Sequence, residues 1–421
     1  MQDRAVSAQA YHQPSLLGVG SVPGERHSPK RPTSDTAGMA DVFPYYAGFS
    51  FAWAHEKLAA LDGDLSTVVL DPWNGSGTTT LAAQACGLST IGVDLNPVAN
   101  IVARLRVNIR HGAKLCQPPE CVFPESTGES DPLCSWLDES TARQLRRWEY
   151  MLRGLDAAES ALGYVALFRV VRQITRRFEG SNPTWVKRTA SSADLVTVPD
   201  SDLDDLIMLE QREVIAKLTR DRYAESPTQV LTASSTALPI ADESVDAILT
   251  SPPYLTRIDY AVAYSRELAV LGIDITRDRY LRANLMGTTL IRSRELREVA
   301  AGGALAQSLM GRVSTHPSKA SGGYYLKQIQ QYIVDLTSSF GELSRVAKVG
   351  AQMILVVQDS YYKDIPIELA AICMEEAGLR GWKVVGTEPF EVTRLLTQMN
   401  KAARAYPKGN VSETVVYLQK G

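Results

Sequence analysis

The feature that most constrains the fold of this chain is an early strand, glycine turn, helix and second strand. Residues 67–70 are apolar or β-branched, as in a buried strand, and Gly75 and Gly77 permit a tight turn close to a ligand. Residues 78–86 predict a helix, and a second buried strand then ends at Asp94. An acid at the carboxyl end of that strand lies where a doubly wound sheet binds ribose hydroxyl groups. The segment therefore predicts a nucleoside-cofactor site.

The residues around the turn narrow the choice of cofactor. A dinucleotide-binding fold needs a third glycine at the position where this chain has Thr80. A phosphate-binding loop needs a lysine after the second glycine, and no lysine follows Gly77. Asp71 in the turn would repel a pyrophosphate, but its carboxylate can accept a hydrogen bond from the amino group of a cationic amino acid. S-adenosylmethionine carries such a group, and the turn favours it over a phosphate-rich ligand.

A second motif, Ser251-Pro252-Pro253-Tyr254, follows the strand-like run of residues 244–250. A proline pair also ends strands for purely structural reasons, so this turn by itself is a modest signal. Its combination with the glycine turn upstream gives it weight.

The two motifs together resemble the DNA amino-methyltransferases, which methylate N4 of cytosine or N6 of adenine. The resemblance rests on Asp71-Pro72-x-x-Gly75-x-Gly77-Thr78, Gly92-x-Asp94-x-Asn96-Pro97 and Ser251-Pro-Pro-Tyr254, and it extends from about Phe43 to the end of the chain. It implies an α/β, Rossmann-like class I methyltransferase fold, with a doubly wound, mostly parallel seven-stranded sheet and a largely helical insertion. It also implies S-adenosylmethionine as cofactor and double-stranded DNA as substrate.

The resemblance also assigns roles to individual residues. Ser251 and the carbonyl of Pro252 would accept hydrogen bonds from the amine, Pro253 would stiffen the turn, and Tyr254 would stack on a flipped base. The predicted cofactor-binding residues are Asp71, Pro72, Asn74, Gly75, Ser76, Gly77, Thr78, Asp94, Leu95, Asn96 and Ser235. Ser234 or Ser235 stands where the family usually has an acid against the cofactor adenine, and a hydroxyl accepts more weakly than a carboxylate.

Several reactions remain open at this stage. Serine at position 251 is commoner among the cytosine enzymes, which favours cytosine N4 over adenine N6. Methylation of cytosine carbon 5 needs a cysteine nucleophile that usually follows a proline, and none of the five cysteines does so. RNA amino-methyltransferases use similar turns, and a DNA-binding regulator without turnover is a further alternative.

The rest of the chain predicts the remaining parts of a methyltransferase. We expect a flexible tail over residues 1–40, a catalytic domain formed by 41–105 and 226–421, and a helical insertion over 106–225. Further elements are a third strand at 229–233, a long amphipathic helix at 324–350 and strands at 353–357, 382–385 and 414–418. The aromatic segment 43–49 either packs beside the methionine end of the cofactor or forms an entry loop at the sheet edge.

The insertion is unusually basic for a chain whose formal net charge is −3. Residues 141–190 contain ten Lys or Arg and four Asp or Glu, and helices are predicted at 141–153 and 161–178. A basic patch is the usual footprint of nucleic-acid binding. Two of the candidate DNA contacts, Arg257 and Tyr260, lie beside the Pro-Pro turn. The full set is Arg169, Arg172, Arg176, Asn182, Trp185, Lys187, Arg257 and Tyr260. The alternatives are a solvated helix face with a packed tryptophan, and an Arg257 ion pair with Asp259 or Glu267.

A polar stretch at 286–323 is a further candidate recognition loop, with arginines at 292, 294, 297 and 312. Composition adds little beyond this, since 421 residues with 45% hydrophobic content suffice for a sizeable core. No apolar run is long enough to span a membrane, and cysteine and histidine spacing predicts neither disulfides nor a metal site. We expect a cytoplasmic, nucleoid-associated prokaryotic protein, and the family leaves open a cognate restriction nuclease or other defence-system partner.

Overall fold

The computed structural model describes residues 29, 42–44, 48–108, 114–119, 131–180, 185–189, 191–218, 226–255, 258–292, 302–391 and 411–421. The tail predicted for residues 1–40 therefore lies outside the described residues, except for position 29.

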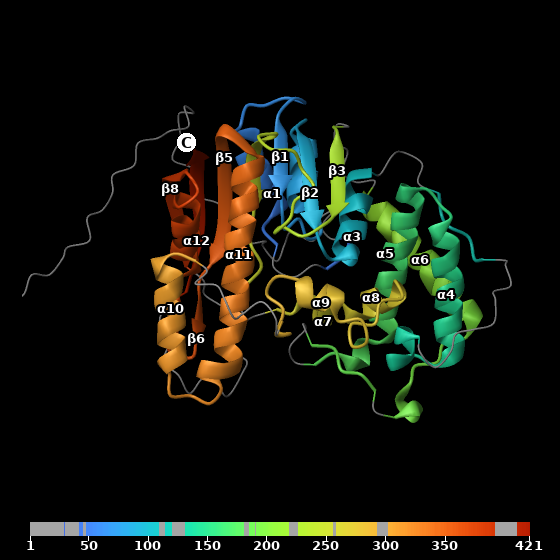
Figure 1. Ribbon diagram of the computed structural model, residues 1–421. Coiled ribbons are helices and arrows are strands. Elements are labelled where there is room, and N and C mark those ends of the chain that lie inside the picture. Colours follow the sequence, from blue (N-terminus) through green and yellow to red (C-terminus); the bar gives the residue numbers. More distant parts are fainter. Residues whose placement is uncertain are drawn as a thin grey trace, which may run out of the picture.

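A seven-stranded sheet forms the centre of the protein (Figure 1). Its strands are β1 (Val68–Asp71), β2 (Ser89–Asp94), β3 (Thr228–Thr232), β4 (Val245–Thr250), β5 (Ala347–Gln358), β8 (Trp382–Glu391) and β9 (Ser412–Lys420). Their order is β3-β2-β1-β4-β5-β9-β8, and β9 pairs antiparallel with both of its neighbours while the other pairings are parallel. This arrangement confirms the predicted Rossmann-like class I methyltransferase fold. A small hairpin, β6 (Ser360–Tyr362) and β7 (Ile365–Ile367), stands apart from this sheet.

Helices cover the sheet and extend beyond one edge. They are α1 (Phe51–Ala59), α2 (Thr78–Ala85), α3 (Pro97–Asn108), α4 (Glu139–Arg153), α5 (Ala157–Ile174), α6 (Asp200–Leu218), α7 (Tyr260–Ala263), α8 (Ser265–Val270), α9 (Tyr280–Asn284), α10 (Ala304–Thr315), α11 (Leu326–Val346) and α12 (Leu369–Gly378). A π-helical turn, Ser321–Tyr325, leads into α11. Within the described residues, no helix is both long and apolar enough to cross a membrane.

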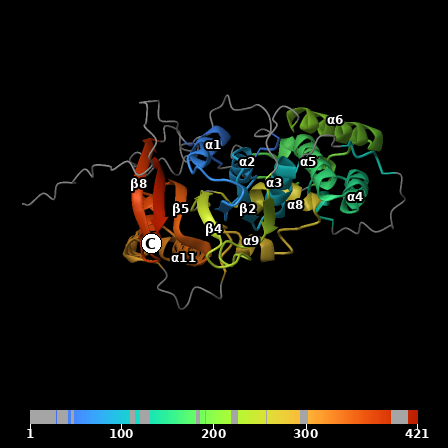
Figure 2. The same cartoon turned by 90° about the horizontal axis from the view of Figure 1, so that it is seen from above.

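Alternate residues of the central strands face opposite sides of the sheet, because side-chain direction in a strand has a period of two. Val69 and Leu249 pack with α1 and α2, whereas Leu70 and Ile248 pack with α11 and α12. Figure 2 shows α1 and α2 on one side of the strands and α11 on the other. Both faces are therefore buried at the centre of the sheet, which explains why residues 68–70 of β1 and 247–249 of β4 are apolar without alternation.

The helices α4, α5 and α6 form a second packed unit beside the β3 edge (Figure 1). Their buried residues share one apolar core with α3, α7 and α8, and this core contains Trp136, Trp148 and Phe168. Asp138 and Asp156 cap α4 and α5 by accepting from backbone N–H groups of the first turn, which explains where these helices begin.

Two predicted helices end earlier in the structure than the sequence suggested. The helix α5 stops at Ile174, where the hydroxyl of Thr175 donates to the carbonyl of Val171 and a short 3₁₀ turn follows. The helix α11 stops at Val346, and residues 347–350 belong to β5. The carbonyls of Arg345 and Val346 accept from Glu243 and Ser244 at the start of β4, so tertiary pairing ends this helix.

Candidate active site

The strands β1 and β4 lie side by side, and the two sequence motifs follow them directly. Ligands of open α/β sheets bind outside the carboxyl ends of the strands at such a point, where the strand order reverses. The ends of the two strands are joined by a hydrogen bond of 2.5 Å from the Thr250 hydroxyl to the Asp71 carboxylate. Thr79 donates to the same carboxylate at 2.6 Å, and the backbone N–H of Trp73 does so at 3.1 Å. The fold therefore brings the two motifs together.

The glycine turn is fastened to the end of β2 through the Asp94 carboxylate. That carboxylate accepts from the backbone N–H groups of Gly75 at 2.9 Å and Asn96 at 2.8 Å. Gly77 begins α2 with a φ of 85°, and a Cβ there would lie 2.8 Å from the Cβ of Ala103. Glycine is required at position 77 because the backbone is left-handed and α3 approaches it closely.

One solvent-open cavity connects the two motifs. It is lined by ten of the eleven predicted cofactor residues, by Ser251, Pro252, Pro253 and Tyr254, and by Tyr260. Gly77 is the exception, because it lies behind the cavity against α3. Gly48 and Phe49 line the cavity as well, whereas Phe43 packs against Phe168 and Tyr264.

Two buried asparagine residues line this cavity, and some of their buried side-chain atoms have no hydrogen-bond partner among the described residues. These atoms are Oδ1 and Nδ2 of Asn74 and Nδ2 of Asn96. Because buried polar groups in proteins are nearly always hydrogen bonded, such atoms indicate a polar ligand. Carboxylates, amides and hydroxyls on one wall can together bind ribose hydroxyls, a ring amine and an amino acid.

Burial alters the two carboxylates on this wall. It raises the pKa of Asp71 to about 6, although the hydroxyls of Thr250 and Thr79 favour the ionised form. It raises the pKa of Asp94 to about 6 as well, and the nearby Asp71 carboxylate adds to the rise. Both groups are therefore mainly ionised above pH 7 and lose their charge in mildly acidic solution.

The Ser251–Tyr254 turn is held from outside. Pro252 and Pro253 have no backbone N–H, so the centre of the turn can be fastened only through its carbonyls. The hydroxyl of the buried Tyr332, in α11, donates to the Pro253 carbonyl at 2.7 Å. Burial raises the pKa of Tyr332 well above its ordinary value, so this hydroxyl remains a donor.

A loop before α10 closes over the same turn. Gly287 has a φ of 80°, and a Cβ at this position would lie 3.1 Å from the Tyr254 carbonyl. Gln331 accepts from the Arg292 backbone at 2.9 Å and donates to the Leu290 carbonyl at 3.1 Å. The helix α11 therefore positions both the turn and the loop that covers it.

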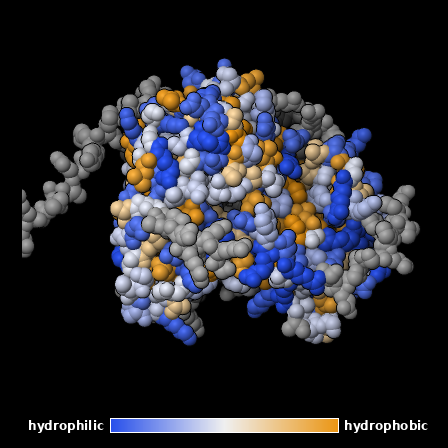
Figure 3. Space-filling model, in the orientation of Figure 1, coloured by the Kyte–Doolittle hydropathy of each residue, from blue (hydrophilic) through white to orange (hydrophobic). Residues whose placement is uncertain are grey.

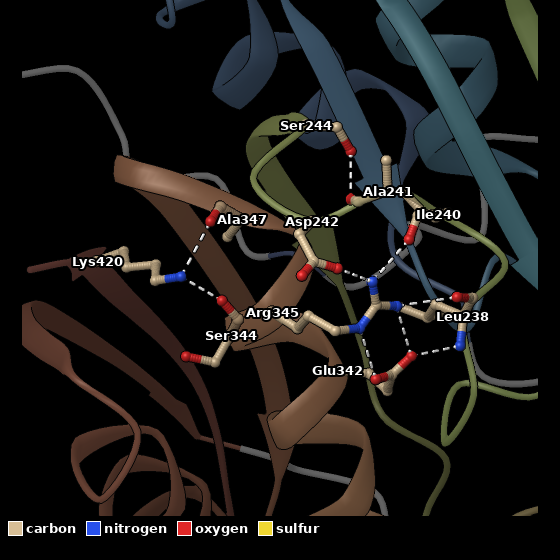
Figure 4. Close-up of polar contacts among 10 residues, drawn as sticks. All are labelled: Leu238, Ile240, Ala241, Asp242, Ser244, Glu342, Ser344, Arg345, Ala347 and Lys420. Carbon is tan, nitrogen blue, oxygen red and sulfur yellow. Dashed lines mark hydrogen bonds and ion pairs between the residues drawn. The ribbon is translucent and has the colours of Figure 1, made fainter.

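Further contacts continue along α11. Asp335 pairs with Arg292 at 2.7 Å, and both side chains line the cavity. One turn later the hydroxyls of Ser339 and Ser235 lie 2.9 Å apart. At the helix end, Arg345 donates to the carbonyls of Leu238 and Ile240 and pairs with Glu342 and Asp242 (Figure 4). This side of α11 therefore contacts the segment after β3, the Ser251–Tyr254 turn and residues 290–292.

Sequence reasoning missed these α11 residues, although it predicted the helix. The available signal was the spacing of Gln331, Asp335 and Ser339, which places three polar side chains at four-residue intervals on one face. Buried polar residues in a row on an amphipathic helix indicate polar partners across the interface. The sequence does not reveal which partners these are.

Comparison with known proteins gives an independent result. No family model matches the chain. The chain is 25% identical over 419 residues to the type II methyltransferase M.BsoBI of Geobacillus stearothermophilus, covering 81% of this chain and 78% of that protein. It is 22% identical over 391 residues to the type II methyltransferase M.AvaI of a Nostoc species, with the same coverage. The chain is a relative of the type II DNA methyltransferases.

Solved structures are more distant. A geranyl diphosphate methyltransferase in complex with SAM aligns with a TM-score of 0.33 and 9% identity, over 89% of this chain and 86% of that one. A SAM-dependent methyltransferase from Methanosarcina mazei aligns with a TM-score of 0.30 and 9% identity, over 84% and 92%.

Two of the arginines predicted to contact DNA are occupied inside the protein. Arg169 pairs with Glu210 and donates to the Val42 carbonyl. Arg172 pairs with the fully buried Glu267 and lies over the rings of Phe43 and Tyr264. Their guanidinium groups stabilise the packing of α5 and are not available to bind a DNA phosphate.

Other members of the predicted set are accessible. Arg176 and Lys187 are exposed, and the Trp185 side chain is 56% exposed, which excludes the alternative of a packed tryptophan. Asn182 and Arg257 lie outside the described residues, as do the arginines at 294 and 297. The acids proposed as partners of Arg257 have other partners, because Asp259 pairs with Arg282 and Glu267 pairs with Arg172.

No group of three His, Cys, Asp or Glu side chains within the described ranges is arranged to hold a metal ion. The cysteines at 86, 116, 134 and 373 are free thiols. Cys121 lies outside the described residues.

Proposed function

We propose that the protein transfers the methyl group of S-adenosylmethionine to the exocyclic amino nitrogen of a base flipped out of double-stranded DNA. One observation carries the proposal: a single cavity at the β1–β4 switch point is lined both by the nucleoside-binding wall and by the Ser-Pro-Pro-Tyr turn. A cofactor and a base placed in it would meet without further rearrangement. The type II methyltransferases related to this chain support DNA methylation as the reaction.

The cofactor wall fits the chemistry of S-adenosylmethionine. The Asp94 carboxylate would accept from the ribose hydroxyls, and the Asn74 amide and the Asn96 Nδ2 group, which have no partner among the described residues, would satisfy polar groups of the nucleoside and amino acid. The Asp71 carboxylate would attract the cationic amino group, although the hydroxyls of Thr79 and Thr250 already bind it. When bound, the cofactor would supply the methyl group: its carbon–sulfur bond would break as the amine nitrogen bonds to the carbon, and the nitrogen would release one proton to solvent.

The Ser-Pro-Pro-Tyr turn would act on the base. An exocyclic amine conjugated to its ring is a poor nucleophile, so the acceptors must draw its hydrogens away from the ring plane and aim the lone pair. The Ser251 hydroxyl and the Pro252 carbonyl would accept those hydrogens, and the Tyr254 ring would stack on the base. Correct placement of two reactants can lower a barrier by roughly 7 to 11 kcal/mol, so positioning alone can supply much of the catalysis.

We propose cytosine N4 as the preferred target, because Ser251 begins the turn, and adenine N6 as the second candidate. RNA and a non-catalytic DNA-binding role are the further alternatives. Among the accessible residues of the insertion, Arg176, Trp185 and Lys187 would contact the duplex. A cognate restriction nuclease is the partner that the family resemblance implies.

Expression in a host without DNA methylation, followed by single-molecule sequencing of its genome, tests the proposal. N4-methylcytosine in one sequence motif would support cytosine N4 as the target. N6-methyladenine would instead support adenine N6. Purified protein would then be incubated with radiolabelled S-adenosylmethionine and either the duplex or structured RNA. Soluble protein that binds the cofactor but labels neither would contradict the proposal.

A further inference from the structure

An exposed tyrosine stands beside the cavity. The side chain of Tyr280, the first residue of α9, is 73% exposed, more than any other large hydrophobic side chain in the described ranges. Single exposed aromatics are common on protein surfaces and need no special explanation. The position of Tyr280 relative to the candidate active site sets it apart from the others.

The helix α9 connects this tyrosine to the wall of the cavity. Asn284, at the other end of the helix, lines the cavity together with Leu285 and Met286, and its side-chain amide donates to the Tyr280 carbonyl at 2.9 Å. Four residues of helix rise by about 6 Å. Tyr280 therefore lies about one helical turn along α9 from a residue of the cavity wall.

Hydrogen bonds hold the helix α9 in place. Arg282 donates to the buried Asp259 at 3.0 Å, and the hydroxyl of Thr289 donates to the same carboxylate oxygen at 2.7 Å. Asp278 accepts from the Tyr280 backbone at 2.9 Å and so fixes the start of the helix. An exposed aromatic on such a mount keeps its place without contacts of its own ring.

The surroundings of Tyr280 suit a polyanion. Arg279 is exposed just before it, and Arg277 is exposed as well but pairs with Asp274 at 3.7 Å. Arg188 donates to Asp274 at 3.2 Å and to Thr276 at 3.3 Å, which joins this segment to the one that carries the exposed Trp185 and Lys187. Figure 3 shows hydrophilic residues gathered over the region of α8 and α9. The segment that carries this aromatic ring therefore also carries exposed cations, which are the side chains that bind phosphates.

We propose that Tyr280 is a DNA-contacting residue that stacks on the duplex where the target base has left it. The inference rests on the proposed function, because it requires a base to leave the duplex. Flipping removes the stacking of the target on its neighbours, and an aromatic side chain can replace part of it. Stacking of one base on an aromatic ring is worth about 10-fold in affinity.

The test uses Tyr280→Ala with a duplex containing the motif found in the modified genome. We expect kcat/KM on the matched duplex to fall about 10-fold, and to fall much less on a duplex with a mismatch opposite the target, since a mismatched base is already easier to flip. With 2-aminopurine at the target position and sinefungin bound, the variant should show a weaker fluorescence rise. Tyr280→Trp should retain the ring and therefore restore activity.

Tyr150→Ala is the matched control, because Tyr150 is 56% exposed on α4 and does not line the cavity. This variant should have an unchanged kcat/KM on both duplexes. The inference would be overturned if Tyr280→Ala had the same kcat/KM as the unaltered protein on both duplexes. It would also be overturned if kcat/KM fell equally on both duplexes. Neither outcome would contradict DNA methylation itself. Failure of the unaltered protein to methylate DNA would instead overturn the proposed function.

Discussion

The carboxyl edge of the sheet and the α4–α6 insertion both contain polar residues that stand out in the sequence, and the fold uses them in opposite ways. At the sheet edge, buried polar side chains such as Asn74 and Asn96 line a cavity, and some of their atoms have no partner within the described residues. In the insertion, Arg169 and Arg172 face carboxylates of neighbouring segments. The sheet edge therefore presents polar residues to a cavity, whereas the insertion uses these two arginines in ion pairs that stabilise the fold.

The strongest test of this difference is Arg172→Ala. The Glu267 side chain is fully buried against Arg172, so its carboxylate would be left without this partner. Removing one member of a buried pair costs about 3–5 kcal/mol, and we expect that loss in the free energy of unfolding measured with urea. Arg176→Ala is the control: its side chain is exposed, and unfolding should change by no more than about 0.5 kcal/mol. Similar losses in both variants would remove the distinction between internal and displayed arginines.

At the sheet edge, Ser251→Ala and Tyr254→Ala should lower kcat by about 100-fold, because the amine would lose an orienting acceptor or its stacking surface. The dissociation constant for S-adenosylmethionine, measured by calorimetry, should stay within about 2-fold. Ser244→Ala, at the opposite end of β4, removes a hydroxyl that donates only to the Ala241 carbonyl and should leave turnover intact. Parallel loss of cofactor binding in the Ser251 and Tyr254 variants would contradict the assigned roles.

The reverse behaviour is expected of Asp94→Asn. Loss of a charged acceptor should weaken cofactor binding by about 10-fold while leaving the bound complex able to react. Because burial raises the pKa of both Asp94 and Asp71 to about 6, both carboxylates ionise as the pH rises through 6. Cofactor affinity of the unaltered protein should therefore increase between pH 5 and pH 7, and the increase should be shallower in Asp94→Asn. A dissociation constant that is constant over this range would count against both carboxylates as ligands.

The smallest effect is expected for Tyr332→Phe, which removes the hydrogen bond to the Pro253 carbonyl and leaves the ring in place. We expect kcat to fall about 5-fold with cofactor affinity unchanged, because the turn would be less well positioned. Tyr164→Phe removes a comparable buried hydrogen bond, to Glu149 at 3.0 Å in the insertion. Both variants should lose about 1 kcal/mol of stability, but only the first should lose turnover. Identical kinetics would assign Tyr332 a purely structural role.

The sequence alone was sufficient for the sheet and for most of the cavity wall. A buried strand, two glycines and an acid at the end of the next strand form a unit whose geometry depends on backbone conformation over a short distance. Gly77 illustrates this, because its left-handed backbone follows from the turn that the spacing predicts, whereas its contact with α3 does not. The Ser251–Tyr254 turn was equally visible, since it follows a strand that must lie beside β1.

The tertiary structure alone decided which distant groups meet. Tyr332 reaches Pro253 across 79 positions, and Arg292 reaches Asp335 across 43, so no local pattern names these partners. The sequence showed that the insertion is rich in Lys and Arg, but it did not show which side chains are buried. Arg172 points into the protein, whereas Arg176 and Tyr280 are exposed. Backbone preferences act over a few residues and can be read along the chain. Burial and charge pairing depend on which elements pack together, and that is settled only when the chain folds.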